Sequence, residues 1–291
     1  MSGIARTSAA ITITNALPTG VGCAVGIALH CEAQVTLSID PSLRTATLEI
    51  PADVRSSVVE ESLRSGLEHY YPQPGATARL SLRSEIPLAK GLKSSSAVST
   101  SILLAVARAA DRNPTAMEIG LHSAEVGRRA GVSATGALDD ALAGLDPGFV
   151  ITENSRGDVL RRSPVDSDWG VALYVPTQSH PPSPNLIATF SAERPAGERA
   201  VRAALTGDWA AAMRLNSELV ERSMGYSYGE IRERLRMNGA IASGVSGLGP
   251  TLAAIAPRDR LTDVVRAFPS DAAAKFTVAF TRTSAMEGAG P

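Results

Sequence analysis

The order of apolar and polar positions along the 291-residue chain predicts a mixture of strands and helices. Short runs of β-branched or alternating apolar residues predict strands, because successive side chains of a strand point to opposite faces. Segment 78–84 alternates most clearly, with Ala78, Leu80 and Leu82 between arginine and serine residues. The other predicted strands span residues 9–14, 23–29, 34–39, 45–50, 149–152, 171–175, 251–255 and 276–280.

Longer segments predict helices. Segment 115–130 has the clearest start, because Thr115 precedes Glu118 by three residues, the spacing of a capping box. Segment 98–110 is apolar and alanine-rich, which predicts a buried helix. The other predicted helices span residues 54–70, 196–205, 209–223, 228–237 and 261–267.

These elements do not alternate in the regular β-α order of a doubly wound sheet, so the predicted fold class is α+β. We expect two lobes that meet near residue 150. The predicted N-terminal lobe covers 1–150, the C-terminal lobe 151–283, and residues 284–291 form a frayed tail. Four prolines without periodicity in segment 176–185 predict an exposed loop.

Composition narrows the classes of partner. A hydrophobic fraction of 44% is enough for one large core or two smaller ones, and the formal net charge is −1. Such a chain has no global basic field for nucleic acid or anionic lipid, whereas small or nucleotide-like ligands stay open.

Cysteine usage and the N-terminus bear on the compartment. Cys23 and Cys31 form neither a zinc motif nor a disulfide framework, which fits a reducing compartment. The N-terminus lacks a signal-peptide pattern, and no apolar run approaches the roughly 20 residues of a membrane span. We therefore expect a cytoplasmic protein without a membrane segment.

The strongest chemical signal is the sequence Gly-Leu-Lys-Ser-Ser-Ser-Ala at residues 91–97. A glycine and consecutive serines at a helix start present backbone N–H groups and hydroxyls where the helix dipole is positive, which favours phosphate. The common Gly-x-x-x-x-Gly-Lys-Ser/Thr loop is absent from the chain. A helix that is simply capped by serine is the alternative interpretation.

Three carboxylates are candidate partners of this loop. Glu125 lies in a predicted helix, and Asp139 and Asp140 follow a glycine-containing turn. If they converge on the loop, they can hold Mg²⁺ and a reacting hydroxyl, as phosphoryl transfer requires. The alternatives are a solvated Glu125 flanked by Arg128 and Arg129, and an ordinary acidic helix start for the aspartates.

Three motifs together resemble those of the GHMP small-molecule kinases. They lie at 15–26, 87–97 and 243–250, in the order and approximate spacing of that superfamily. The central motif, Pro-x-x-x-Gly-Leu-x-Ser-Ser, matches at every defining position, which are Pro87, Gly91, Leu92, Ser94 and Ser95.

Within the superfamily, the chain is most similar to the archaeal-type shikimate kinases. The likeness is carried by Asn-Ala-x-x-Thr-Gly-x-Gly-x-Ala-x-Gly-Ile at 15–27, by Ile-Pro-x-x-x-Gly-Leu-Lys-Ser-Ser-Ser-Ala-Val at 86–98 and by Thr-Gly-Ala-x-Asp-Asp-Ala at 135–141. The lysine before three serines and the Asp-Asp turn are the features that point to shikimate.

The resemblance implies a GHMP-kinase-like two-lobed α+β fold, with a ribosomal protein S5 domain 2-like N-terminal lobe and a ferredoxin-like C-terminal lobe. It implies ATP and Mg²⁺ as cofactors, with Ser95 and Glu125 as metal ligands and Asp139 as the residue that accepts or orients the substrate proton. Asp140 is its close rival, and Lys93 is the third candidate catalytic residue. The residues implied to bind ATP are Pro87, Lys90, Gly91, Leu92, Lys93, Ser94, Ser95, Ser96 and Ala97. Those implied on the substrate side are Asn15, Thr19, Gly20, Gly22, Ser246, Gly247 and Gly249.

The implied reaction is ATP-dependent phosphorylation of shikimate to shikimate 3-phosphate, by a monomer or homodimer. Alternatives within the superfamily are kinases acting on homoserine, pantoate or a cyclitol. A decarboxylase of a phosphorylated acid is disfavoured by the lysine and the Asp-Asp turn, and a non-catalytic binding protein is a further alternative. The sequence does not choose which arginine meets the shikimate carboxylate, and the candidates are Arg6, Arg83, Arg162, Arg222 and Arg232.

Overall fold

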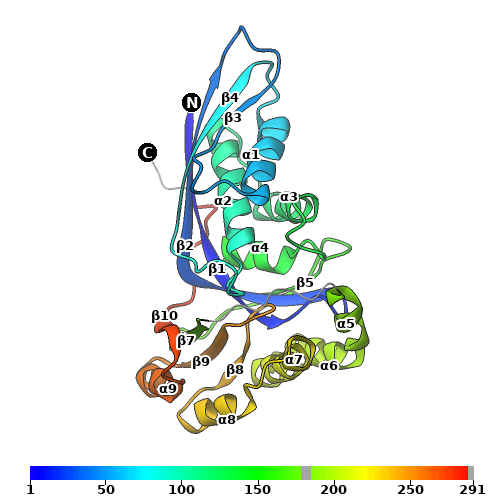
Figure 1. Ribbon diagram of the computed structural model, residues 1–291, viewed down its shortest axis with the longest axis vertical. Helices are drawn as coiled ribbons and strands as arrows, with labels where there is room; N and C mark the ends of the chain where they lie inside the picture. Colours follow the sequence, from blue (N-terminus) through cyan, green and yellow to red (C-terminus); the bar gives the residue numbers. More distant parts are fainter. Residues whose placement is uncertain (178–184, 288–291) are drawn as a thin grey trace.

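The computed structural model describes residues 1–177 and 185–287, which form two sheets with helices packed on them (Figure 1). The first sheet has the strand order β3-β4-β2-β5-β6, with β1 pairing β2 on its other edge. All of its pairs are antiparallel except β3 with β4. Its strands are β1 (Ser2–Thr14), β2 (Val21–Ile39), β3 (Thr47–Glu49), β4 (Ala76–Ser84), β5 (Phe149–Glu153) and β6 (Asp158–Ser163).

The long strands β1 and β2 form the spine of this sheet. The sequence predicted two separate strands at 23–29 and 34–39, but β2 is continuous over 19 residues. No glycine or proline interrupts residues 28–36, so nothing in the chain breaks the extended conformation. The C-terminal half of β2 pairs with β4 and its N-terminal part pairs with β5. One strand therefore connects the two ends of the sheet.

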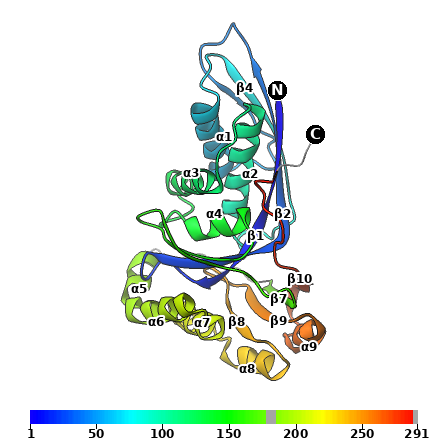
Figure 2. The same ribbon diagram turned by 180° about the vertical axis from the view of Figure 1, so that it is seen from behind.

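Four helices cover one face of the first sheet, as the front and back views show (Figures 1 and 2). The central helix α2 packs on β1 so tightly that a Cβ on Gly3 would lie 2.3 Å from the carbonyl oxygen of Ala105. The capping box predicted at Thr115 and Glu118 is present at the start of α3. These helices are α1 (Ser57–Tyr70), α2 (Ser94–Ala109), α3 (Ala116–Arg129) and α4 (Leu138–Leu145).

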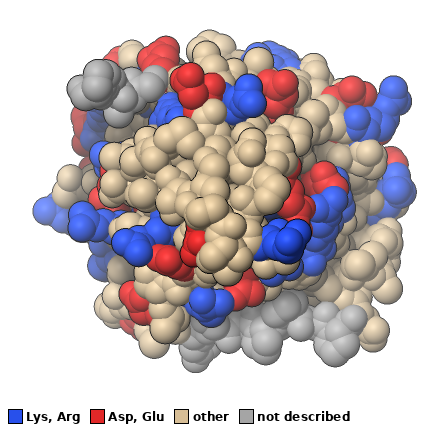
Figure 3. Space-filling view, turned by 90° about the horizontal axis from the view of Figure 1, so that it is seen from above, with Lys and Arg blue, Asp and Glu red and all other residues tan. Residues whose placement is uncertain are grey.

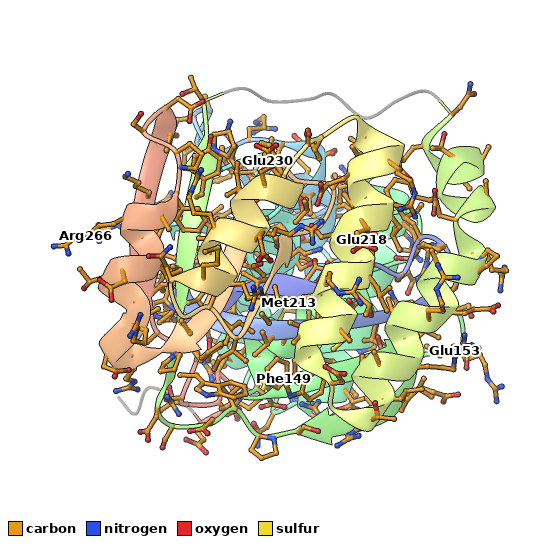
Figure 4. The ribbon with its side chains drawn as sticks, turned by 90° about the horizontal axis from the view of Figure 1, so that it is seen from below. Phe149, Glu153, Met213, Glu218, Glu230 and Arg266 are labelled. Carbon is orange, nitrogen blue, oxygen red and sulfur yellow. The ribbon has the colours of Figure 1, made fainter. Side chains whose placement is uncertain are left out.

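The second sheet is antiparallel, with the order β10-β7-β9-β8. In the view from below, Met213 of α7 lies near the middle of the helix layer, whereas Arg266 of α9 points outward at the edge (Figure 4). The strands are β7 (Trp169–Pro176), β8 (Ala242–Val245), β9 (Leu252–Pro257) and β10 (Ala272–Val278). The helices are α5 (Leu186–Ala192), α6 (Arg194–Thr206), α7 (Trp209–Met224), α8 (Gly229–Met237), the 3₁₀ turn η1 (Arg258–Arg260) and α9 (Leu261–Ala267).

The two halves share buried contacts. Phe149 of β5 stacks on Trp209 of α7 with ring centroids 4.1 Å apart, and Phe280 forms a β-bridge with Ile27 of β2. A single apolar cluster runs from β1 and α2 to β7 and β9. The α+β class predicted from the sequence is confirmed. The boundary near residue 150 stays a proposal, because the chain passes between sheets only after Ser163.

Several local predictions were wrong. Residues 242–245 form a strand at the start of the 243–250 motif, where no strand was predicted. Residues 138–145 form a helix, which was only the alternative interpretation of the Asp139-Asp140 turn. Strand β6 was not predicted, and the strand predicted at 45–50 shrinks to three residues. In the segment predicted as an exposed loop, residues 178–184 lie outside the described residues.

The segment after β10 returns to the first sheet. The hydroxyl of Ser284 donates to Asp146 at 2.6 Å, and the backbone N–H of Ala285 donates to the carbonyl oxygen of Leu145 at 2.7 Å. The frayed tail predicted from residue 284 is therefore anchored over its first described residues, while 288–291 lie outside the described part.

Seen from above, the surface carries basic and acidic side chains interspersed around a broad uncharged area (Figure 3). This face has no continuous basic patch, in keeping with the formal net charge of −1. Within the described residues, no helix is both long enough and apolar enough to cross a membrane.

Candidate active site

A cavity of about 980 Å³ lies where the helix starts of the first half meet the loop after β8. Its volume is at the upper end of the range for small-molecule sites, which is enough for a nucleotide and a second small ligand. Its wall includes Thr12 of β1, the starts of α1 and α2, the 132–137 loop, Asp139 and Asp140 of α4, and the 247–249 loop.

The N-terminus of α2 opens into this cavity. The residue before the helix is Lys93, which has a left-handed conformation with φ 64°, and no side chain caps the helix. The serine-capped helix considered from the sequence is therefore absent. Ser94, Ser95 and Ser96 instead occupy the first turn and line the cavity, where their uncapped backbone N–H groups and the helix dipole favour an anion.

The loop before α2 requires glycine at residue 91. Gly91 has φ +80°, and a Cβ there would lie 2.1 Å from the carbonyl oxygen of Ser246. Both the backbone conformation and the available space therefore exclude a side chain. This close approach brings the second motif of the sequence against the third.

Ser246 joins three segments that are distant in the sequence. Its hydroxyl donates to the carbonyl oxygen of Gly91 at 2.7 Å and accepts from the backbone N–H of Thr12 at 3.2 Å. The hydroxyl of Thr12 in turn accepts from the backbone N–H of Gly247 at 2.9 Å, and the side-chain amide of Asn15 donates to the carbonyl oxygen of Gly247 at 3.2 Å. The three motifs therefore meet at one place.

Two tyrosines hold the 247–249 loop from the other side. The hydroxyl of Tyr226 donates to the carbonyl oxygen of Leu248 at 2.9 Å, and that of Tyr228 donates to Pro250 at 3.0 Å. The two rings stack with centroids 5.4 Å apart. This support fixes the loop wall that faces the N-terminus of α2.

The first turn of α4 supplies two buried carboxylates. Asp139 is 4% exposed and Asp140 is 7% exposed, and both line the cavity. Lys93 Nζ lies 3.0 Å from Oδ2 of Asp140, so a cation sits beside the pair at the start of α2. This arrangement places one basic and two acidic side chains next to the uncapped N-terminus of α2.

Burial and mutual repulsion disfavour the charged forms of these aspartates. Desolvation, and then the neighbouring Asp140, raise the pKa of Asp139 to about 7, against the opposing effects of Lys93 and Asn154. Desolvation also raises the pKa of Asp140, although Lys93 opposes the shift. A carboxyl group with a pKa near neutrality is suited to proton transfer.

The structure brings most, but not all, of the predicted residues to the cavity wall. Asp139, Asp140 and Lys93 line it together. The predicted binding residues that also line it are Gly91, Ser94, Ser95, Ser96, Asn15, Gly247 and Gly249. Those outside the wall are Pro87, Lys90, Leu92, Ala97, Thr19, Gly20, Gly22 and Ser246.

Several of the predicted residues that do not line the cavity contact the core or the loops around it. Leu92 and Ala97 are buried in the core beneath the loop, and Lys90 Nζ donates to the carbonyl oxygen of Pro176 at 2.9 Å. Gly22 packs on the carboxylate of Asp139, and Ser246 acts through the loop contacts described above. Their predicted roles in ligand binding stay predictions.

Glu125 is not brought to the cavity. Ser123 and Gly127 of α3 line it, but at 100° per residue Glu125 is turned about 200° away from each of them. Its carboxylate is half exposed and pairs with Arg129. The solvated-residue alternative matches this position, and its role as a metal ligand stays a prediction that the geometry does not support.

The five arginines considered for a substrate carboxylate do not line the cavity either. Arg222 pairs with Glu193 and Arg232 with Glu221, while Arg162 lies 3.7 Å from Asp146. Arg6 and Arg83 are exposed on the first sheet. Of the described residues, the basic side chains in the cavity wall are Arg55 and Lys93.

Sequence reasoning missed several residues of the site. Thr12 and Ser99 line the cavity from within regular elements, where nothing in the local pattern singles them out. Thr135 belongs to the Thr-Gly-Ala-x-Asp-Asp-Ala motif, which was the available signal. Asn154 donates to Asp139 at 3.0 Å from the end of β5, and only the sheet register places it there.

Family models and curated relatives both match this chain over most of its length. Residues 57–146 match the family described as GHMP kinases N terminal domain, and residues 200–274 match GHMP kinases C terminal. The shikimate kinase of Pyrococcus abyssi is 33% identical over 270 residues, which cover 93% of this chain and 96% of that protein. The shikimate kinase of Pyrococcus furiosus is 32% identical over 269 residues, covering 92% and 97%.

Solved structures resemble the fold at much lower identity. The mevalonate kinase of Methanococcus jannaschii superimposes with a TM-score of 0.69 at 12% identity, over 97% of this chain and 99% of that one. At this identity the likeness shows the fold alone.

Proposed function

Because this chain belongs to the GHMP kinase family of small-molecule kinases, we propose that it transfers the terminal phosphoryl group of ATP to a ring hydroxyl of shikimate. The products are shikimate 3-phosphate and ADP. The observation that carries the proposal is the uncapped N-terminus of α2 facing the buried Asp139 across one cavity. Relatives named shikimate kinase that align over nearly the whole chain support the choice of acceptor.

The start of α2 binds the ATP phosphates in this proposal. Ser94, Ser95, Ser96 and Lys93 all line the cavity, and no side chain caps the first N–H groups of the helix. Phosphoryl transfer needs positioning and neutralisation of charge more than covalent participation by the protein. The 247–249 loop closes the phosphate site from the opposite side.

Magnesium fits this donor set as a companion of ATP. Within the described residues, no three acidic, histidine or cysteine side chains are placed to hold a metal ion by themselves. Mg²⁺ typically takes phosphate oxygens, water and one or two protein oxygens, and Ser95 is the cavity hydroxyl best placed by its motif. When bound, the ion neutralises charge on the phosphates.

Asp139 orients the acceptor hydroxyl and accepts its proton, and Asp140 holds Lys93 beside it. Asn15, Gly247 and Gly249 form the substrate side of the wall, while Thr19, Gly20 and Gly22 support it from behind. We also propose a cytoplasmic location and a monomeric or dimeric state, in line with the reducing compartment expected for the two free, buried cysteines.

The fall of kcat/KM at low pH should report the protonation of Asp139 and Asp140. We expect kcat/KM for the acceptor to be constant above about pH 7 and to fall about tenfold per pH unit below it, because protonation removes the base. A coupled ADP assay from pH 5.5 to 9 at saturating ATP measures this. A profile that stays flat down to pH 5.5 would contradict the role of Asp139.

An acceptor panel tests the proposed reaction itself. Purified enzyme with ATP and Mg²⁺ is given shikimate, homoserine, pantoate or a cyclitol, and ADP release is followed. Shikimate should give a kcat/KM at least about 100-fold above the others, because a site built for a substrate's polar groups rejects analogues that lack them. Equal or better turnover of another acceptor would reassign the substrate but keep the kinase chemistry.

A further inference from the structure

Asn154 lies at the first position after β5 and is only 5% exposed. Its side-chain Nδ2 donates to Oδ1 of Asp139 at 3.0 Å. Its backbone N–H donates to the carbonyl oxygen of Gly20 at 2.9 Å, at the end of the loop that begins with Asn15. One residue therefore connects the acidic group, the end of β5 and the first motif.

The orientation of this amide is fixed from behind. The hydroxyl of Thr152, which is fully buried, donates to Oδ1 of Asn154 at 2.6 Å. With its oxygen engaged there, the amide presents its N–H₂ group to the carboxylate, which can only accept when ionised. The hydroxyl of Thr135 lies 3.3 Å from the same Nδ2, so the amide nitrogen has polar neighbours on two sides.

The other side of Asp139 is closed by Gly22. A Cβ at Gly22 would lie 2.4 Å from Oδ2 of Asp139, so the carboxylate occupies the space of the missing side chain. Gly22 pairs with Thr152 across the β2–β5 ladder. The register of these two strands therefore sets the wall against which the carboxylate rests and, two residues later, the donor that holds it.

We propose that Asn154 is a positioning residue for phosphoryl transfer, which holds the Asp139 carboxylate in the rotation that meets the acceptor hydroxyl. The inference rests on the proposed function of Asp139. Asn154 does not line the cavity, so it acts through Asp139 and not on the substrate. A carboxylate held by a donor on one oxygen loses the freedom to rotate away from the reacting hydroxyl, and small misplacements of a catalytic group reduce rate steeply.

The charged and titratable groups around Asp139 come from three elements. Asp140 is its neighbour on α4, Lys93 approaches from the start of α2, and the Cys23 thiol lies on β2. Asn154 is the neutral donor in this set, and its hydrogen bond favours the ionised form of Asp139.

Two substitutions test the proposal. Asn154→Ala removes the donor, and Asn154→Asp keeps the shape of the side chain but places a third carboxylate beside Asp139. We expect kcat to fall about 10- to 100-fold in Asn154→Ala and further in Asn154→Asp, with the dissociation constant for ATP changed by less than about threefold. Calorimetric titration with ATP measures the latter.

A spectroscopic readout separates this inference from the choice of acceptor. In protein labelled with ¹³C at the aspartate carboxyls, the Asp139 signal is assigned by its loss in Asp139→Asn. Its midpoint should move to higher pH by about one unit in Asn154→Ala, because a bond that favours the charged form is gone. This titration needs no substrate, so it still decides the point if shikimate proves not to be the acceptor.

Matched variants control for general damage. Asn238→Ala removes the hydrogen bond of 2.8 Å that the side-chain amide of Asn238 donates to the carbonyl oxygen of Arg234, outside the cavity wall, and should leave kcat and the Asp139 titration unchanged. Thr152→Val frees the Asn154 amide without removing it and should give a smaller effect of the same sign. The proposal is overturned if folded Asn154→Asp retains kcat within twofold of the unmodified enzyme, or if the Asp139 midpoint does not move in Asn154→Ala.

Discussion

Replacing Asp139 by asparagine is expected to lower kcat about 10²- to 10⁴-fold while ATP binding and the fold are retained. Asparagine has nearly the same shape and can still accept from Asn154, so the cavity wall is preserved. It cannot accept the proton of the acceptor hydroxyl. The coupled ADP assay measures turnover, and calorimetry measures ATP affinity.

The same variant should be more stable than the unmodified protein at alkaline pH. The folded state raises the pKa of Asp139 from 3.8 to about 7, so it holds this proton more tightly than the unfolded chain. The contribution of Asp139 to stability is therefore fully present below about pH 4, declines as the pH rises from 4 to 7, and is lost above 7, where its absence lowers the free energy of unfolding by roughly 2 to 4 kcal/mol. Asp139→Asn removes this penalty.

Thermal unfolding at pH 8 and pH 4.5 measures whether Asp139→Asn is more or less stable than the unmodified protein. The melting temperature of Asp139→Asn should exceed that of the unmodified protein at pH 8, and the difference should shrink at pH 4.5, where Asp139 is protonated. Near-normal turnover would remove Asp139 from the catalytic role and make Asp140 the candidate. Lower stability at pH 8 would instead contradict the buried, destabilised carboxylate.

The second large effect is expected at Gly91. Alanine there would have to adopt φ +80° and would place its Cβ 2.1 Å from the carbonyl oxygen of Ser246. The conformational strain and the forced separation of the two loops together should lower the free energy of unfolding by roughly 2 to 4 kcal/mol. The dissociation constant for ATP should rise about 100-fold, a loss of about 2.7 kcal/mol, because the loop wall moves off the phosphate site.

Substitutions at two other glycines separate the effect of backbone strain from the effect of the steric collision. Gly131 also has a positive φ, +71°, but nothing lies within 4 Å of its Cβ position, so Gly131→Ala carries the conformational strain without the collision. Gly229 starts α8 in open space with an ordinary conformation, and Gly229→Ala should be neutral. Denaturant unfolding and ATP titration compare the three. Equal effects at Gly91 and Gly131 would mean that the contact with Ser246 is unimportant.

Local chemistry explains what the sequence could predict. The candidate phosphate-binding loop was recognisable because its signals, glycine at residue 91 and serines at 94–96, lie within a few residues of one another. Asp139 was recognisable through its motif. The α+β class followed from element types that depend mainly on the period of apolar residues.

The sequence could not predict features that depend on contacts between distant elements. The phase of α3 turns Glu125 away from the cavity, and that phase is set by packing against α2 and α4. Asn154 meets Asp139 only because β5 pairs with β2 in one register. Helix α4 was only an alternative interpretation of the Asp139-Asp140 segment, because its eight residues follow a small-residue turn that resembles a loop.

The bonds at Ser246 also constrain when the protein becomes competent during synthesis. This residue contacts Gly91, which precedes it by 155 positions, and Thr12, which precedes it by 234. A nascent chain that has emerged only through α4 carries the serine turn and both aspartates but lacks the opposing wall. Contacts of such long sequence separation form late, since the chain entropy of closing the loop must be overcome first. Nucleotide affinity should therefore arise only after β8 and β9 have been translated and have paired.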